Sequence, residues 1–243
     1  MLQKTRGIVL HTLKYSDTAL IADIYTEVEG RVSFMVYVSR SKRSKVRPAV
    51  LQPLALVELE ADLRPGVELQ RVREARVAHP LPALPCDPRK ATMALYLAEF
   101  LYRVLREQAG SPALFDYLWH SVICLDECHE GLANFHLVFL LHLLRFLGLS
   151  PNLDGFAPGT CFDLMAASFT VLPPRQHTHW LPAQETAHIP LLMRFNFRSM
   201  RFLRMNRADR ARCLERIHEY YRLHLPGLPE MRSLDVLKEV FNN

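Results

Sequence analysis

Glycine is scarce in this chain, with nine residues among 243. The sequence contains neither the G-x-x-x-x-G-K-[ST] loop that cradles nucleotide phosphates nor the G-x-G-x-x-G turn of dinucleotide-binding folds. Cysteine is scarce too, and its five residues are irregularly spaced with no C-x-x-C pair. These absences argue against a nucleotide-hydrolysing enzyme and against a scaffold held by disulfides.

Long apolar runs are also absent. No stretch approaches the roughly 18–20 apolar residues that span a bilayer. The short apolar stretch after Lys4 and Arg6 is interrupted by His11, which is unlike a signal peptide. We therefore interpret the cysteines as reduced thiols in a cytoplasmic protein without a membrane segment.

The basic excess is concentrated near the N-terminus. The net charge is +5, and residues 1–79 hold 13 Lys/Arg against 9 Asp/Glu, whereas the remainder is almost balanced. One segment supplies five of these cations without an acidic residue, at Arg40, Lys42, Arg43, Lys45 and Arg47. A basic, serine-containing loop can follow a polyanion and release its counterions, so it favours phosphate binding. The alternative is an ordinary solvated loop.

The first 79 residues show the alternation typical of β-strands. Strands are predicted over residues 6–13, 18–28, 31–39, 50–60 and 67–78, with turns at Gly30 and Pro65-Gly66. Five short strands favour a small closed barrel, either an OB-fold or an SH3-like barrel. The alternation slips between Leu69 and Val72, which predicts a bulge.

The outer face of the predicted hairpin carries two tyrosines. Tyr25 and Tyr37 are suited to stacking on bases, but Asp23 and Glu27 on the same face would repel phosphate. Ordinary surface tyrosines are the preferred interpretation. Arg71, Arg73 and Arg76 would extend the basic surface if the last strand lies beside the basic loop.

A proline-rich linker over residues 79–88 marks a predicted domain boundary, with residues 1–79 as one domain and 80–243 as a second, helical one. Asp87-Pro88 and Ser111-Pro112 are helix-start signals, and residues 132–147 are apolar on nearly all sides, as in the centre of a bundle. Residues 150–183 form an irregular insertion in which Phe162–Leu172 is suited to a hairpin, and helices resume near residues 187, 207 and 233. The fold class is therefore multidomain α+β.

Metal and catalytic sites have weak support. Cys161, His177, His179 and His188 are ligand types within 28 residues, but they lack the close pairing of zinc sites. Cys124 and Cys128 are expected to be core residues. Arg194, Arg198 and Arg201 have helical spacing on one face and give a possible second basic surface, with a solvated face as the alternative.

The order of several short strings resembles the RecO family of bacterial recombination mediators, over nearly the whole chain. The strings that carry the resemblance include Thr5–Leu10, Tyr15–Asp17, Tyr25–Arg31, Leu51–Leu54, Tyr96–Leu101, Leu143–Leu153, Tyr220–Leu228 and Ser233–Leu237. The resemblance implies an N-terminal OB-fold and a helical C-terminal domain. Many members carry a four-cysteine zinc finger after the Pro-Asn-Leu segment, but here only Cys161 remains, so we expect a metal-free hairpin and no cofactor.

The resemblance also implies a function. It implies binding of single- and double-stranded DNA, annealing of complementary strands, and assistance in loading RecA with RecR and the tail of SSB as partners, in the cytoplasm at the nucleoid. The DNA contacts are expected at Arg40, Lys42, Arg43, Lys45 and Arg47, with Arg31, Lys4 and Arg6 as weaker candidates. Two alternatives stay open, an OB-fold module for RNA and a metal-dependent hydrolase that uses Cys161, His177 and His179.

Overall fold

The computed structural model describes residues 2–37, 46, 48–64, 66–106 and 110–242. They pack as two compact units, which we call the barrel unit and the helical unit. The barrel unit holds the chain up to Glu127 together with Glu230–Phe241, and the helical unit spans Cys128–Pro229. The boundary predicted at residue 79 coincides with the end of the last barrel strand and stays a prediction.

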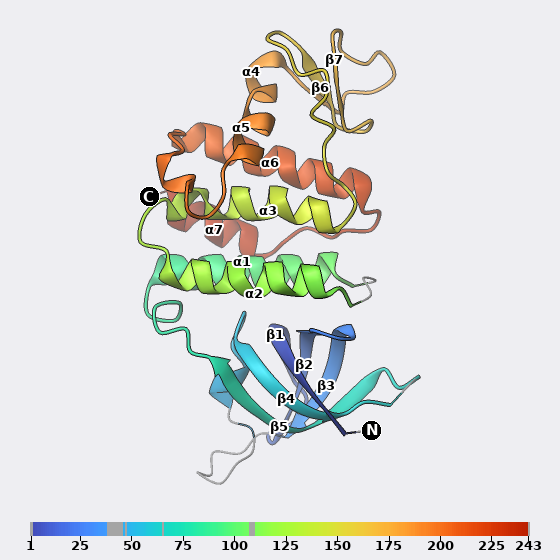
Figure 1. Cartoon of the computed structure of the whole chain (residues 1–243), viewed down its shortest axis with the longest axis vertical. Coiled ribbons are helices and arrows are strands. Elements are labelled where there is room, and N and C mark those ends of the chain that lie inside the picture. Colours follow the sequence, from blue (N-terminus) through green and yellow to red (C-terminus); the bar gives the residue numbers. More distant parts are fainter. Residues whose placement is uncertain (1, 38–45, 47, 65, 107–109, 243) are drawn as a thin grey trace. The chain divides into compact units, whose positions relative to one another are not determined.

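The barrel unit contains five strands that close on themselves (Figure 1). They are β1 (Leu2–Lys14), β2 (Ala19–Thr26), β3 (Gly30–Tyr37), β4 (Leu56–Asp62) and β5 (Leu69–His79), in the order β1-β2-β3-β5-β4. The β3–β5 pair is parallel and the other pairs are antiparallel, with a short helix, η1 (Pro48–Leu51), between β3 and β4. This is the topology of an OB-fold, so the prediction of that fold is confirmed.

The core of the barrel comes from the residues that alternation points inward. Val9, Ile24, Phe34 and Val57 are each fully buried. Gly30 has φ +71°, a left-handed conformation that suits the predicted β2–β3 turn. The predicted strand over residues 50–60 begins later than expected, because η1 occupies its first residues.

Three helices belong to the barrel unit: α1 (Pro88–Val104), α2 (Pro112–Glu127) and α7 (Ser233–Asn242). Asp87 caps α1 as predicted, accepting a 2.9 Å hydrogen bond from the amide of Arg89. The carboxylate of Glu99 accepts the Ser233 amide at 2.8 Å, which caps α7 from a residue distant in sequence.

The α1–α2 segment covers the outer face of the β2–β3 hairpin. Tyr25 is completely buried, and its ring stacks against that of Phe115 at 6.4 Å. Asp23 is also buried and accepts a hydrogen bond from Ser33. Tyr25 is therefore neither a base-stacking nor a surface tyrosine, and both interpretations of it were wrong. Period-2 alternation finds one buried face but does not show whether helices cover the other.

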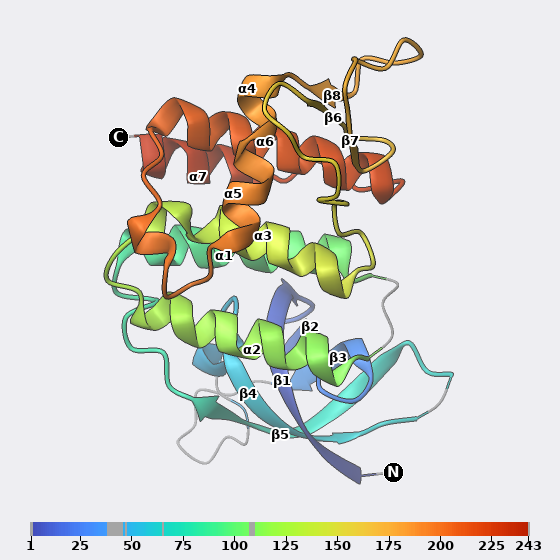
Figure 2. The same cartoon turned by 45° about the horizontal axis from the view of Figure 1, so that its top comes forward.

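The helical unit combines a helix pair with a small sheet (Figure 2). Its elements are η2 (Leu132–Asn134), α3 (Phe135–Phe146), β6 (Cys161–Asp163), β7 (Ser168–Thr170), β8 (Trp180–Leu181), α4 (Ala183–Thr186), α5 (His188–Arg194), η3 (Met200–Phe202) and α6 (Arg207–His224). The Tyr221 hydroxyl on α6 donates to the Leu140 carbonyl on α3 at 2.7 Å. β6 pairs with β7 and β8, which confirms the predicted hairpin. Within the described residues, none of the helices combines the length and apolarity that a membrane crossing needs.

Candidate nucleic-acid interface

An open groove of about 670 Å³ runs along the barrel where β3 ends and β5 begins. It brings together aromatic, apolar and basic side chains from three strands and two connections, together with the acidic Asp62, which pairs with Arg64 at 3.2 Å. Its lining includes Tyr37, Val46, Arg64, Leu69, Arg71 and Arg73. We call it the barrel groove. Cations beside exposed apolar and aromatic surface are the usual composition of a single-strand binding groove.

The parallel pairing of β3 with β5 builds the centre of this groove. Met35 on β3 lies opposite Arg71 on β5. The Arg71 guanidinium lies 5.2 Å from the ring centroid of Tyr37, whose side chain is 54% exposed. A ring backed by a guanidinium and open on its other side can stack on a base while the cation neutralises phosphate. Tyr37, unlike Tyr25, thus has the position for base stacking.

A buried amide fixes the turn that carries Arg64. Gln70 is 8% exposed, and its Oε1 accepts the Arg64 amide at 2.9 Å. Its Nε2 donates to the carbonyls of Arg64 at 2.8 Å and Val67 at 2.7 Å. Each end of the amide is therefore satisfied, and the backbone at Arg64 and Val67 is held against β5.

The slip in alternation has a different position from the predicted one. β5 has register shifts between Val72 and Glu74 and between Val77 and His79, and neither falls between Leu69 and Val72. Leu69 faces outward into the groove, whereas Gln70 faces inward. The alternation slips in the sequence because the polar Gln70 takes an inward position and the apolar Leu69 an outward one.

One residue before the predicted basic loop and one within it line the barrel groove. Arg40, Lys42, Arg43, Lys45 and Arg47 lie outside the described residues. Tyr37, before the segment, and Val46, within it, both line the groove. Arg71 and Arg73 line the groove with these two residues, and an extension of the basic surface by the loop arginines stays a prediction.

Arg76 lies elsewhere, although it is on the same strand. Its guanidinium pairs with Glu58 at 2.7 Å, and it lines a separate hollow with Lys4, Glu60 and Glu74. Three carboxylates against two cations give this hollow an acidic character. Lys4 is exposed and was a weaker candidate for DNA contact, and its surroundings favour phosphate less than those of Arg71.

Arg6 and Arg31 make contacts within the barrel unit. Two hydrogen bonds join Arg6 to Glu27, at 3.0 and 2.7 Å, and they lower the pKa of that carboxyl below its ordinary value. The Arg6 guanidinium also lies 5.1 Å from the ring of Trp119. Arg31 donates to the Tyr102 carbonyl at 2.7 Å. These contacts give both arginines a role in packing helices on the barrel, and their contact with DNA stays a prediction.

The predicted helical face of Arg194, Arg198 and Arg201 does not exist. α5 ends at Arg194, because Phe195 takes an extended conformation, and Arg201 belongs to the separate helix η3. The side chain of Asn196 accepts the amides of Arg198 and Ser199, so a side-chain turn replaces the next helical turn. The arginines still lie on one short exposed segment.

The candidate metal ligands of the helical unit are dispersed into ion pairs. His177 lies 3.5 Å from Asp163, and His179 lies 2.8 Å from Glu219. Over the part of the chain that the structure describes, no three His, Cys, Asp or Glu side chains form a group that could hold a metal ion. Cys128 and Cys161 are buried and Cys124 is partly buried, so the described residues offer no support for the hydrolase alternative.

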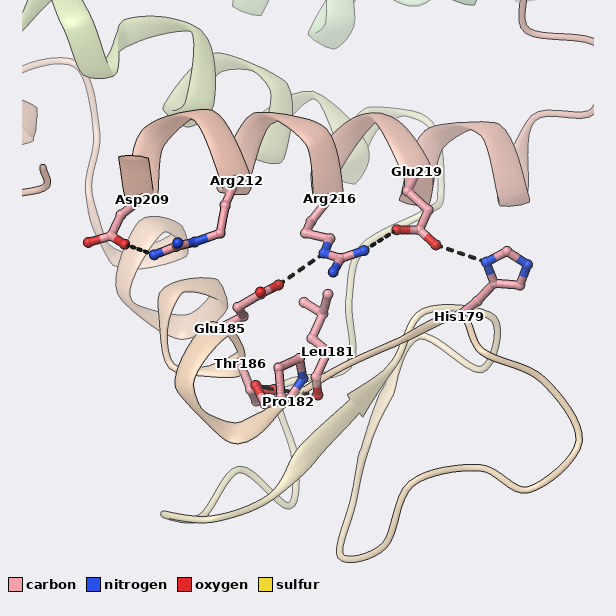
Figure 3. A network of polar contacts seen from close by, with 9 residues as sticks. All are labelled: His179, Leu181, Pro182, Glu185, Thr186, Asp209, Arg212, Arg216 and Glu219. Carbon is pink, nitrogen blue, oxygen red and sulfur yellow. Dashed lines mark hydrogen bonds and ion pairs between the residues drawn. The ribbon is translucent and has the colours of Figure 1, made fainter. Parts of the chain in front are cut away.

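Glu219 belongs to a chain of ion pairs along α6 (Figure 3). Arg216 bonds both Glu219 and Glu185 at 2.9 Å, and Arg212 pairs with Asp209. Partial burial raises the pKa of Glu219, but bonds from His179 and Arg216 outweigh this effect and lower it overall. Beneath this chain lies a small cavity of about 50 Å³ lined mainly by apolar side chains, Leu181 and Ile217 among them.

Sequence reasoning missed Arg64 and Gln70. The available signal for Gln70 was a polar residue at an inward position of an otherwise apolar alternation, directly after the Pro65-Gly66 turn. Such a residue must find hydrogen-bond partners, and the nearest are the backbone groups of that turn. Once Gln70 is recognised as the residue that bonds this turn, Arg64 becomes a candidate, because it is the cation that the turn carries.

Comparison with known proteins gives matches along the chain. A family model described as "Recombination protein O N terminal" matches residues 1–81, and one described as "Recombination protein O C terminal" matches residues 86–234. The chain is 53% identical to a protein of Bacteroides fragilis named DNA repair protein RecO and 51% identical to one from Phocaeicola vulgatus, over 242 residues each. A protein of the same name from Porphyromonas gingivalis is 34% identical over 247 residues. All three alignments cover 100% of both chains.

Proposed function

The chain belongs to the RecO family of DNA repair proteins, and from this membership and the barrel groove we propose that it binds single- and double-stranded DNA and anneals complementary strands. It acts in DNA repair and recombination. The observation that carries the proposal is the placement of Tyr37, Arg64, Arg71 and Arg73 in one groove, which Val46 of the basic segment also lines.

The composition of the barrel groove suits the binding of DNA strands of any base sequence. Arginines that contact phosphates position a strand but do not read its bases. The Tyr37 ring stacks on any base, because every base has a π-face. The side chains in the groove thus suit a protein that must act at many different sites of damage.

Annealing follows from binding and needs no catalysis. Two DNA strands repel each other, and a protein that neutralises phosphates on both lowers this repulsion and raises their local concentration. We accordingly propose a mediator without enzymatic activity.

We further propose RecR, the C-terminal tail of SSB and, indirectly, RecA as partners, on the basis of family membership. The acidic SSB tail requires an apolar surface flanked by unpaired cations. The cavity under α6 fits this requirement poorly, because Arg212 and Arg216 already pair with Asp209, Glu185 and Glu219 (Figure 3). We therefore place the tail outside this cavity.

The deciding experiment is annealing of complementary oligonucleotides over a KCl series, together with the affinity for a single strand. The test variant replaces Arg64, Arg71 and Arg73 with Gln. Each lost single-strand phosphate contact lowers the slope of log affinity against log salt by about 0.7, so three lost contacts lower it by roughly 2. We expect slower annealing, weaker binding and the flatter slope.

A matched control replaces Arg76, Arg89 and Arg103 with Gln. These arginines are exposed in the barrel unit and lie outside the groove lining, so the control loses the same charge. Equal losses in the two variants would mean that net charge, and not the groove, governs binding. A preference for RNA over DNA of matched sequence would indicate 2′-hydroxyl contacts and contradict the DNA assignment.

A further inference from the structure

Residues 194–207, which we call the arginine segment, connect α5 to the first turn of α6 (Figure 2). The segment contains five arginines and no acidic residue. The arginines, all exposed, are Arg194, Arg198, Arg201, Arg204 and Arg207. Arg201 lies 3.5 Å from Glu130, whereas Arg194, Arg198 and Arg204 have no ion-pair partner among the described residues. Like charges so close together are unfavourable unless a polyanion neutralises them.

Buried side chains from η2 and α3 fix the backbone of this segment. The Nδ2 of Asn134 donates to the carbonyls of Met200 at 3.3 Å and Leu203 at 3.0 Å. The Nε2 of His142 donates to the Phe195 carbonyl at 2.8 Å. The Phe197 ring stacks on Phe135 with centroids 4.6 Å apart. The cations therefore project from a held backbone, which reduces the entropy lost when they bind a ligand.

Gly131 shows how closely the segment approaches η2. A Cβ at this position would lie 2.9 Å from backbone atoms of Arg201, and the φ of Gly131 is +76°. Both facts favour glycine, since a larger residue would push the segment away. The position of Arg201 is thus set by backbone packing and does not depend on its single ion pair.

One aromatic side chain accompanies the cations. Phe202 is 66% exposed, and the Arg201 guanidinium lies 4.7 Å from its ring centroid. Met200 and Leu203 are buried and Phe195, Phe197 and Met205 are partly buried, so Phe202 is the one large apolar side chain of the described segment that is mostly exposed. An acidic peptide would need an apolar pocket for its side chains, whereas a nucleic acid needs a ring on which a base can stack.

We propose that the arginine segment is a second binding surface for single-stranded nucleic acid, in which Arg194, Arg198 and Arg204 contact phosphates and Phe202 stacks on a base. This inference rests on the proposed DNA binding and extends it to the helical unit. A protein that anneals strands must hold two at once, and a second surface provides a place for the other strand.

The test uses the full chain and a fluorescent oligothymidylate of about 15 nucleotides, a length that one surface of this kind accommodates. The variant replaces Arg194, Arg198 and Arg204 with Gln and leaves the barrel groove intact. Binding is followed by anisotropy over a KCl series, and photo-crosslinking to a thiothymidine oligonucleotide maps the contacted peptides. The matched control replaces Arg145, Arg175 and Arg222, three other exposed arginines of the helical unit.

We expect crosslinks to a peptide containing Phe202, and we expect the variant, but not the control, to lose them. The salt slope should fall by up to about 2 if this surface dominates binding to a short strand, and annealing should slow. Crosslinks confined to barrel peptides, with unchanged annealing in the variant, would overturn the inference while the proposed function stands. Equal losses in variant and control would also overturn it.

Two further outcomes contradict the inference in different ways. If the variant keeps its DNA binding but loses affinity for an acidic peptide, the segment is a protein-docking surface. If the wild type and all variants fail to bind any DNA, the proposed function fails together with the inference. The Phe202→Ala variant separates stacking from charge, because it should weaken binding several-fold and leave the salt slope unchanged.

Discussion

The barrel groove and the arginine segment hold their cations by the same device, a buried amide side chain that bonds to irregular backbone. In the barrel unit Gln70 bonds the turn that carries Arg64, and in the helical unit Asn134 bonds the segment that carries Arg201 and Arg204. An amide is suited to this task because it donates and accepts hydrogen bonds without carrying a charge that burial would penalise.

The two amides differ in how completely they are satisfied. Gln70 uses both its oxygen and its nitrogen, and the backbone it holds lies at a partly exposed turn. Asn134 uses its nitrogen alone, its buried Oδ1 has no hydrogen-bond partner in the described part of the chain, and both carbonyls that it holds are buried. Removal of Asn134 should therefore cost more, since water reaches the β4–β5 turn more easily than the interior of the helical unit.

The largest effect is expected for Asn134→Leu. This change keeps the branching at Cγ, although leucine is larger, and leaves the buried carbonyls of Met200 and Leu203 without their donor, at a cost of about 3 kcal/mol. Urea unfolding measures the loss, and hydrogen exchange should show reduced protection of residues 195–205. Gln176→Leu, an exposed amide of the same unit, should change stability by less than about 0.5 kcal/mol. Unchanged exchange in Asn134→Leu would show that aromatic packing alone holds the segment.

Gln70→Leu should have a smaller effect on stability, about 2 kcal/mol, because the freed groups at Arg64 and Val67 can bond to water. The effect of Gln70→Leu on DNA binding should differ from the effect of removing cations. The affinity should fall several-fold because Arg64 is no longer held in place, but the salt slope should hardly change because no charge is lost. Gln52→Leu, at an exposed amide of the barrel unit, is the control. Wild-type affinity in Gln70→Leu would exclude a role for the held turn in binding.

Strand alternation and turn residues made the barrel predictable from the sequence. Val32 and Phe34 alternate with Arg31 and Ser33, and Gly30 gives the turn, so the hairpin of β2 and β3 followed from few assumptions. Alternation alone left an OB-fold and an SH3-like barrel open, and the resemblance to the RecO family favoured the OB-fold. The parallel β3–β5 pair, which connects residues with no local pattern in common, confirms that choice.

The sites were less predictable, because they depend on long-range contacts of polar side chains. Arg6 and Arg31 looked like free cations in the sequence, but Glu27 and the Tyr102 carbonyl engage them. The spacing of Arg194, Arg198 and Arg201 fitted a helix, but Asn196 and Ser199 offer the backbone a competing set of bonds. A local pattern reflects conformational propensity, but it does not show which residue, distant in sequence, a polar group will bond in the folded chain.

The smallest expected effect is a pH dependence of stability, which distinguishes the buried amides of Gln70 and Asn134 from the ion pairs of α6. Asn134 does not titrate, whereas the pKa of Glu219 is lower in the folded chain than its ordinary value of 4.5. A lowered carboxyl pKa stabilises the fold at pH values above that ordinary pKa, and this contribution to stability disappears as the pH falls through the pKa of the folded state.

Glu219→Gln should therefore be less stable than the wild type at pH 7, by about 0.5 kcal/mol after solvent screening. The difference should shrink below about pH 4.5 in urea unfolding of the two proteins. Asp154→Asn, at an exposed carboxyl of the same unit, is the control for the loss of one negative charge. A difference that stays constant with pH would mean that Glu219 acts through packing and not through its charge.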